Sequence, residues 1–344
     1  MRCLMELQGY SSCGNVVESQ RGFARPCEAG LRIIAGEIHR LIYDMVLSRP
    51  EDYLSIYQSC CNHRCLFCHS WYFSQRAVGK WMSPKDVVNE VLKYREYVTV
   101  WEPRDRATSW HAHDLCAHCG SCVELGERPW FCPNKLKPDQ IVLSPQGYGP
   151  ARNIVSFTGG DLFCRPEFYA KTFELIKREA PDMWIHIETN GWGLTPKNLE
   201  ILRSAGLDSV WLDMKAYRRD TYRELCGTDN DRVLQLPAEI RDAGLVLEIV
   251  LLYIPSYVEE DQLQSFVELI ASVDPYTPVT LIAFFPEYRM LGVRPPTLDE
   301  MIRGFKALRS KLHRVRVGNV SVFCRDEECV KKLVNEIGRE NVAL

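Results

Sequence analysis

The 344-residue sequence predicts an α/β fold in which helices cover a parallel sheet. Short apolar runs rich in β-forming residues alternate with longer amphipathic stretches, which is the order of repeated strand–helix units. The runs are apolar along most of their length, as strands buried on both faces are. Six such units are too few for a closed eight-stranded barrel. We therefore expect an open partial barrel or a doubly wound sheet.

The elements follow in chain order. The predicted strands are residues 53–57, 154–158, 183–188, 209–214, 246–253 and 279–285. The helix after the first strand is expected at 83–98, and later helices at 166–180, 196–205, 232–243 and 261–273. These later stretches open near Pro, Thr, Asp or Arg and tend to close near Gly or Asp, as helix termini do.

Residues 101–150 interrupt this alternation. They show no clear period, and a structureless segment of this length inside a compact domain needs something to order it. Four cysteines fall in the segment, so metal ligation is the expected organiser. The predicted domain plan is therefore an N-terminal extension (1–50), a partial barrel (51–100 and 151–290), a cysteine-rich insertion (101–150) and a C-terminal extension of helix and strand (291–344).

Composition excludes several classes of protein. Hydrophobic residues make up 46% and charged residues 25%, which is ordinary for a soluble globular chain. A net charge of −3 argues against electrostatic binding of nucleic acid. The longest apolar stretches are far shorter than the ~20 residues of a membrane span. No secretory signal is visible at the start, so we expect a cytoplasmic protein without a membrane span.

Cysteine is the unusual residue, at 15 of 344 positions. The number is odd and the cysteines are bunched, a pattern that favours metal or redox ligands over disulfides. Five of them have no recognisable spacing and are interpreted as core or incidental thiols: Cys3, Cys13, Cys27, Cys324 and Cys329.

Three cysteines follow the first predicted strand as Cys61-x3-Cys65-x2-Cys68. Three thiolates on one tight loop can hold three corners of a [4Fe–4S] cube and leave one iron open for a small molecule. Carboxyl ends of parallel strands are also where barrel active sites lie. The alternative is a structural zinc site with His63 or His69 as the fourth ligand.

The loop sequence CNHRCLFCH resembles the signature of radical S-adenosylmethionine (SAM) enzymes, especially the branch of glycyl-radical-enzyme activating enzymes such as pyruvate formate-lyase activating enzyme. Further matching segments arrive in order: Thr158-Gly159-Gly160-Asp161, Glu188-Thr189-Asn190-Gly191, Asp213-Met214-Lys215, Gly227-Thr228-Asp229-Asn230 and Phe284–Met290. The resemblance covers about residues 53–290. It implies a (β/α)6 partial TIM-type barrel in which SAM chelates the open iron. Reductive cleavage then produces a 5′-deoxyadenosyl radical that abstracts hydrogen.

The resemblance also implies residue roles. Cys61, Cys65 and Cys68 would ligate the cluster, and Phe67 would pack near the adenine. The remaining expected SAM-binding residues are Thr158, Gly159, Gly160 and Asp161, along the methionine moiety, and Glu188, Asn190, Asp213 and Lys215, which end the next two strands. Without the resemblance, Gly159-Gly160 would be interpreted as a simple turn and Asp161 as a helix N-cap before Pro166.

The insertion carries Cys116-x2-Cys119-x2-Cys122-x9-Cys132-Pro133, which resembles half of a bacterial ferredoxin motif. Four thiolates would make a closed second [4Fe–4S] cluster suited to electron transfer. The alternative is a four-cysteine zinc site. The presence of His111, His113 and His118, residues of a type that also binds zinc, supports retaining this alternative.

The leading hypothesis is a radical SAM oxidoreductase that resembles the activating enzymes. It would receive electrons from a ferredoxin- or flavodoxin-type donor and act on a glycyl radical enzyme. Direct modification of a small molecule, lipid or peptide is the first alternative. A non-catalytic iron–sulfur electron carrier or zinc protein is the second.

Overall fold

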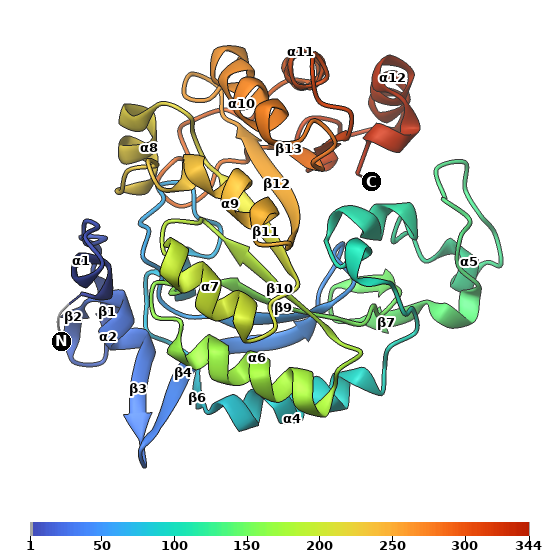
Figure 1. The fold of residues 1–344 in the computed structure, drawn as a ribbon. Coiled ribbons are helices and arrows are strands. Elements are labelled where there is room, and N and C mark those ends of the chain that lie inside the picture. Colours follow the sequence, from blue (N-terminus) through green and yellow to red (C-terminus); the bar gives the residue numbers. More distant parts are fainter. Residues whose placement is uncertain (1–2, 344) are drawn as a thin grey trace.

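The computed structural model describes residues 3–343, and within them one ten-stranded sheet dominates the fold (Figure 1). Its order is β14-β13-β12-β11-β10-β9-β5-β4-β3, with β6 also paired to β4. Neighbouring strands from β5 to β14 run parallel. They are β5 (Leu54–Gln58), β9 (Ile154–Gly159), β10 (Trp184–Thr189), β11 (Ser209–Met214), β12 (Val246–Tyr253), β13 (Val279–Ala283) and β14 (Val315–Gly318). The fold is the predicted α/β partial barrel, with β14 as an added parallel strand.

Helices connect the parallel strands. They are α4 (Pro84–Arg95), α6 (Glu167–Glu179), α7 (Pro196–Ser204), α8 (Arg219–Cys226), α9 (Leu236–Asp242), α10 (Glu260–Val273) and α11 (Leu298–Leu308). Ser83 and Asp86 form a capping box at the start of α4, and Thr195 caps α7 ahead of Pro196. Such caps satisfy the first backbone N–H groups of a helix. The short polar helix α8 was not expected from the sequence.

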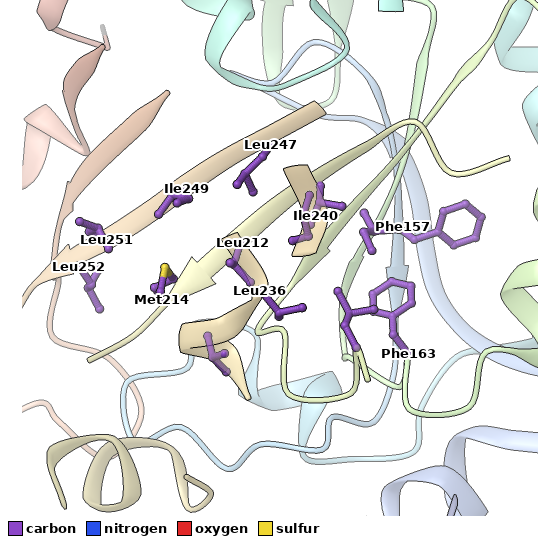
Figure 2. Close-up of a cluster of buried hydrophobic side chains, with 14 of the residues drawn as sticks. Phe157, Phe163, Leu212, Met214, Leu236, Ile240, Leu247, Ile249, Leu251 and Leu252 are labelled. Carbon is purple, nitrogen blue, oxygen red and sulfur yellow. The ribbon is translucent and has the colours of Figure 1, made fainter. Parts of the chain in front are cut away.

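The main hydrophobic core lies between the sheet and these helices. Figure 2 shows side chains from β11 and β12, including Leu212 and Ile249, facing Leu236 and Ile240 of α9. Phe157 on β9 and Phe163 in the following loop continue the same core. Burial on one face of α9 and along the strands holds the carboxyl ends of the strands in fixed register.

An antiparallel edge precedes the first parallel strand. β3 (Leu31–Ile34) and β4 (Glu37–Leu47) form a hairpin whose two-residue turn, Ala35-Gly36, has positive φ at both positions. Turns of this geometry match the twist of paired strands. β4 then pairs with β5 and with β6 (Lys80–Met82). Smaller elements stand before the hairpin: α1 (Leu4–Leu7), β1 (Val17–Ser19), β2 (Gly22–Ala24) and α2 (Pro26–Gly30).

The insertion is ordered in its first third by buried polar contacts. Arg152 is fully buried, is paired with Glu102 and donates to the carbonyl of Thr108 at 2.8 Å. Glu248 on β12 accepts from the backbone N–H groups of Ser109 at 2.7 Å and Trp110 at 2.8 Å. The expectation that metal ligation organises the whole segment therefore needs correction, because side chains of the barrel hold this part in place. The regular elements of the insertion are η1 (Arg104–Arg106), η2 (Trp110–Asp114), α5 (Ser121–Glu124), η3 (Pro138–Gln140), β7 (Val142–Ser144) and β8 (Gly147–Gly149).

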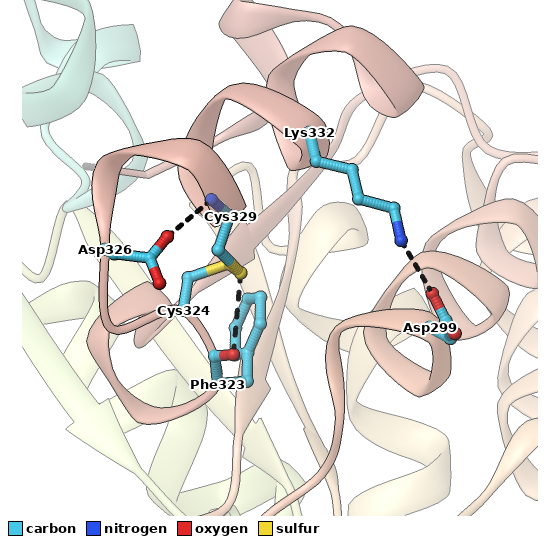
Figure 3. The surroundings of a disulfide bond; sticks show 6 residues. All are labelled: Asp299, Phe323, Cys324, Asp326, Cys329 and Lys332. Carbon is cyan, nitrogen blue, oxygen red and sulfur yellow. Dashed lines mark hydrogen bonds and ion pairs between the residues drawn. A yellow bond between two sulfur atoms is a disulfide. The ribbon is translucent and has the colours of Figure 1, made fainter.

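The C-terminal segment ends with η5 (Val320–Val322), α12 (Glu327–Ile337) and η6 (Arg339–Asn341). A disulfide joins Cys324 to Cys329, and Asp326 caps the first turn of α12 by accepting from the Cys329 N–H at 2.8 Å (Figure 3). These two cysteines were interpreted as core or incidental thiols. Cys324 is buried in the core and Cys329 packs against it, but the two are joined in a disulfide and are not thiols. Among the described helices, none combines the length and apolarity that crossing a bilayer would require.

Candidate functional site

A cavity of about 370 Å³ opens at the carboxyl ends of the parallel strands. It brings together most of the residues predicted from the sequence: Cys61, Cys65, Phe67, Cys68, Thr158, Gly159, Asp161, Glu188, Asn190, Asp213 and Lys215. They come from the loop after β5 and from the ends of β9, β10 and β11. The volume lies within the ~300–1,000 Å³ range of small-molecule sites.

The cysteine loop is held by backbone hydrogen bonds on both sides. The N–H groups of Arg64 and Leu66 donate to the carbonyls of Cys226 and Leu225, at 3.0 and 2.8 Å, at the end of α8. The Asn62 N–H donates to the Asp161 carbonyl at 3.0 Å. The unexpected helix α8 is thus one support of the loop, because its last carbonyls need partners.

Of the three thiols of the loop, those of Cys61 and Cys65 are buried and that of Cys68 is partly exposed. Burial and the nearby Asp161 carboxylate raise the pKa of Cys61 well above its ordinary value. A hydrogen bond with Cys226, followed by burial, raises the pKa of Cys65, and burial raises the pKa of Cys68 to about 11. The thiols are therefore protonated without a metal. Three soft sulfur donors lining one cavity fit an iron–sulfur cluster, whose binding would release their protons.

His63 is occupied by other contacts. Its Nδ1 is 2.9 Å from the Asn62 side chain, and its Nε2 is 3.0 Å from the hydroxyls of both Tyr222 and Thr228. Burial lowers the pKa of His63 to about 3, so the ring is neutral. A zinc ion bound by His63 would have to displace one of these partners. His69 lines the cavity near Phe285, with ring centroids 6.1 Å apart.

Asp161 joins three loops of the site. Its carboxylate accepts from Thr189 Oγ1 at 2.6 Å, Asn190 N at 3.0 Å, Phe163 N at 3.1 Å and Asn62 Nδ2 at 3.4 Å. Burial raises the pKa of Asp161, and these donors act in the opposite direction. The N-cap alternative for Asp161 was wrong, because Pro166 stands at the N-cap position of α6 and no side chain caps that helix.

Gly160 packs under the cysteine loop rather than facing the cavity. A Cβ atom at this position would lie 2.4 Å from the carbonyl oxygen of Cys60 and 2.6 Å from that of Gln58. Its own N–H donates to Gln58 at 2.7 Å. Only glycine fits between these two carbonyls. The backbone therefore approaches the cysteine loop closely at Gly160, whereas the sequence predicted this residue along the methionine moiety of SAM.

Arg40 was missed by the sequence reasoning. This fully buried side chain of β4 donates to the carbonyls of Cys60 at 3.3 Å, Gly160 at 3.0 Å and Gly30 at 3.0 Å. It lies close enough to Asp161 to favour the carboxylate form of that residue. Arg40 therefore holds the cysteine loop and the glycine turn together. Its position within a hairpin strand that also contains Glu37, His39 and Asp44 carried no local signal of this role.

The remaining polar residues at the strand ends are paired. Thr158 donates to the Glu188 carboxylate at 2.6 Å and Tyr53 donates to it at 2.9 Å, while burial raises the pKa of Glu188 to about 7. Asp213 and Lys215 form an ion pair at the end of β11. Burial alone would lower the pKa of Lys215, but Asp213 holds it above its ordinary value. The Lys215 ammonium stands 5.5 Å from the centre of the Phe67 ring.

In the insertion, Cys116 lies within electrostatic reach of Cys119 and Cys122. Burial raises the pKa of Cys116 to about 11, and repulsion from Cys119 and Cys122 contributes to the shift. Cys132 has a different neighbour, because the Arg128 guanidinium donates to its sulfur at 3.8 Å. His118, a candidate for the zinc alternative, is 3.0 Å from the buried Asp52 carboxylate. Across residues 3–343, no three His, Cys, Asp or Glu side chains are close enough to share a single metal ion.

A second cavity of about 570 Å³ adjoins the first, and Glu51, Trp211, Ile282 and Asn319 line both. It lies between the insertion and the C-terminal segment. Its other walls include Cys119, Trp130 and Phe131 from the insertion and Val320, Cys324 and Val330 from the C-terminal segment. The sequence did not predict this cavity, because its walls come from segments that no motif connects.

A sequence profile of the radical SAM superfamily matches residues 113–270, a range that begins after the loop carrying Cys61, Cys65 and Cys68. Pyruvate formate-lyase 1-activating enzyme of Escherichia coli (strain K12) is 22% identical over 299 residues, which cover 82% of this chain and 98% of that enzyme.

Two solved structures share the fold at a TM-score of 0.50. Streptococcus suis SuiB is 14% identical over 78% of this chain and 50% of its own chain. HydG, a maturase of the [FeFe]-hydrogenase, is 11% identical over 84% of this chain and 55% of its own. At these identities the two likenesses concern the fold alone.

Proposed function

Since this chain carries a radical SAM domain, we propose that it cleaves SAM reductively at a [4Fe–4S] cluster held by Cys61, Cys65 and Cys68. The main support is that the three thiols line one cavity with the carboxylates and the lysine at the ends of β9, β10 and β11. When bound, the cluster supplies an electron and SAM supplies a 5′-deoxyadenosyl radical that removes hydrogen from a substrate.

The chain's own residues would bind and orient SAM. Gly159 lines the cavity and lets the backbone approach closely, and the paired Asp213 and Lys215 present both signs of charge to a zwitterionic amino-acid group. Phe67 offers an apolar face beside that pair. Asp161 keeps the three loops in register, and its negative charge favours an ammonium group nearby.

Within this chemistry, the activity we propose is that of an activating oxidoreductase, with a glycyl radical enzyme as the protein substrate. The similarity to the E. coli activating enzyme along nearly the whole of that enzyme supports it. Cys116, Cys119, Cys122 and Cys132 would hold a second [4Fe–4S] cluster that passes electrons from a ferredoxin- or flavodoxin-type donor. A reducing cytoplasm suits these thiol-rich sites.

Direct modification of a small molecule or peptide is the second candidate. The second cavity favours it, because a space of about 570 Å³ with Trp130, Phe131 and Trp211 in its walls adjoins the SAM site. A substrate held there would be close to the residues that line both cavities. Aromatic walls favour a partly apolar substrate.

The test is SAM cleavage by protein reconstituted anaerobically with ferrous iron and sulfide. Addition of dithionite and SAM should release 5′-deoxyadenosine and methionine. Cys61→Ala should abolish the product and lower the iron content, whereas Cys60→Ala, one position earlier in the same buried loop, should keep both. Stoichiometric zinc without acid-labile sulfide in the wild-type protein would contradict the proposal.

The two candidates differ in what happens to the radical. With a glycyl radical enzyme present, an activating enzyme should generate the doublet electron paramagnetic resonance signal of a glycyl radical. A direct modifier should instead transfer hydrogen from a small substrate into 5′-deoxyadenosine. Deuterium in recovered 5′-deoxyadenosine, after incubation with labelled protein or labelled small molecules, identifies the donor.

A further inference from the structure

Glu51 stands where the two cavities meet. It lines both of them, together with Trp211, Ile282 and Asn319, and it is the one charged side chain of these four. Its carbonyl oxygen accepts from the guanidinium of the buried Arg152 at 3.2 Å, which fixes the backbone just before β5. A carboxyl group is therefore held at the passage between the first cavity and the second.

No basic side chain neutralises this carboxyl group. Arg49 is paired with Asp52 at 2.9 Å, and Arg152 is paired with Glu102. Across residues 3–343, none of the ion pairs formed by Lys or Arg includes Glu51. Burial raises the pKa of Glu51 to about 7, and the negative charges of Asp52 and Glu248 add to the increase. Because a buried carboxylate is stabilised by an opposite charge, a cation that entered the cavity would find a partner here.

Trp211 supplies the aromatic part of the junction. It lies on β11 in register with Glu188 of β10 and with Glu248 of β12. Trp211 and Asp213 stand two residues apart on this strand, so they face the same side of the sheet, and both line the first cavity. The face of an indole ring attracts cations, and carboxyl groups on both neighbouring strands strengthen that attraction.

The far side of the second cavity presents two aromatic rings. Trp130 and Phe131 of the insertion lie with their ring centroids 5.5 Å apart, and both line the cavity. The indole N–H of Trp130 donates to the carboxylate of Glu327 at 3.4 Å, and the carbonyl of Phe131 accepts from the Arg339 guanidinium at 2.6 Å. The cavity therefore combines an acidic end beside the first cavity with an aromatic wall held by the C-terminal segment.

We propose that the second cavity binds a primary amine with a partly apolar body. Its ammonium group lies between Glu51 and Trp211, and its apolar part lies against Trp130 and Phe131. Since Glu51 is at the end next to the first cavity, the carbon that bears the nitrogen is the part of the molecule nearest to the SAM site. The role of this amine as the substrate rests on the proposed direct modification, whereas its binding does not depend on SAM cleavage.

The first test compares three probes with the same apolar body: 4-phenylbutylamine, 4-phenylbutanol and 4-phenylbutyrate. Calorimetric titration of the reconstituted full-length protein at pH 8 keeps the amine charged and Glu51 mostly ionised. We expect the amine to bind at least about tenfold more tightly than the alcohol, and the carboxylate to bind more weakly than the alcohol. Equal affinities for the amine and the alcohol, or no binding of the amine, would overturn the proposal.

The second test locates the ammonium group. Glu51→Gln should lower the affinity for the amine to about that for the alcohol and leave the affinity for the alcohol unchanged. Glu327→Gln is the matched control, because Glu327 lines the same cavity but is exposed and paired with Lys331 at 2.8 Å. A preference for the amine that survives Glu51→Gln, or that is lost in Glu327→Gln alone, would overturn the proposal.

A third variant covers the case in which Glu51→Gln does not fold. Trp211→Leu keeps an apolar side chain and removes the indole face, so it should reduce the preference for the amine over the alcohol by about threefold or more. An unchanged preference in this variant would contradict the proposal.

The outcomes separate this site from the proposed function. Selective amine binding by a protein that releases no 5′-deoxyadenosine from SAM would leave the site standing and count against the proposed function. Release of 5′-deoxyadenosine by a protein that does not select the amine would overturn the site alone.

Discussion

Replacing Gly160 by alanine tests the claim that the cysteine loop rests on this glycine. The new Cβ would lie 2.4 Å from the carbonyl oxygen of Cys60, whereas ordinary contacts begin near 3.4 Å. Either the loop or the turn must then move by about 1 Å. Both near neighbours are backbone carbonyls, so no side-chain rotation can relieve the contact. The φ angle of Gly160 is not in the left-handed region, so the effect is purely steric.

The expected loss of unfolding free energy is about 3 kcal/mol, the upper part of the range for overpacking in a rigid environment. The displaced carbonyls of Cys60 and Gly160 also lose their alignment with Arg40. Because Cys61 follows Cys60 directly, the first cluster should assemble poorly. We expect iron content to fall by about four atoms per chain and SAM cleavage to fall more than tenfold.

The assay combines urea unfolding under anaerobic conditions with iron and sulfide analysis and 5′-deoxyadenosine release. Gly292→Ala is the matched control, because a Cβ there has no atom within 4 Å and its φ is also ordinary. If Gly160→Ala matches Gly292→Ala in stability and iron content, the steric argument for the glycine is wrong.

Three further predictions concern charges and thiols. Asp161→Asn should lower the unfolding free energy by about 2 kcal/mol and weaken SAM binding at least tenfold. The reason is that one amide oxygen cannot replace two carboxylate oxygens, each of which accepts from a backbone N–H group. Unchanged urea unfolding and unchanged SAM affinity would contradict this prediction. Burial raises the pKa of Glu248 to about 7, so its folded form binds a proton more tightly than the unfolded chain and stability is lost as pH rises from about 4.5 through 7. Glu248→Gln removes this loss, so between pH 5 and pH 8 the unfolding free energy of the variant should rise by about 3 kcal/mol relative to that of the wild type. Urea denaturation of both proteins at the two pH values measures this change. A difference between the two proteins that is the same at both pH values would disprove the prediction. Cys119→Ser with Cys122→Ser should remove the second cluster and increase amide hydrogen exchange at residues 116–136 only. A uniform increase in exchange from residue 102 to residue 136 would show that the buried Arg152–Glu102 pair does not hold the first part of the insertion.

The sequence by itself determined the alternation of parallel strands with helices and the chemical character of the site. Residues 209–214 and 246–253 were predicted as strands and are β11 and β12 at the same bounds. Uninterrupted apolar runs and helix caps are local signals, and alternation of strands and helices is enough to predict a parallel sheet. Parallel strands end at one edge, so motifs at successive strand ends had to meet in one place. The spacing of Cys61, Cys65 and Cys68 predicted the ligands of an iron–sulfur cluster at that place.

Only the tertiary structure decided which side chains support that site. Arg40 reaches the cysteine loop from a strand of the antiparallel hairpin, and Glu248 holds the insertion across more than a hundred residues. The packing of Cys3 and Cys13 around Cys164 is of the same kind, because segments far apart in the chain meet only after the barrel has formed. Such contacts have no sequence period, since they depend on the positions of packed elements rather than on neighbours along the chain. Local patterns therefore predict the elements and the motifs, and packing alone determines their partners.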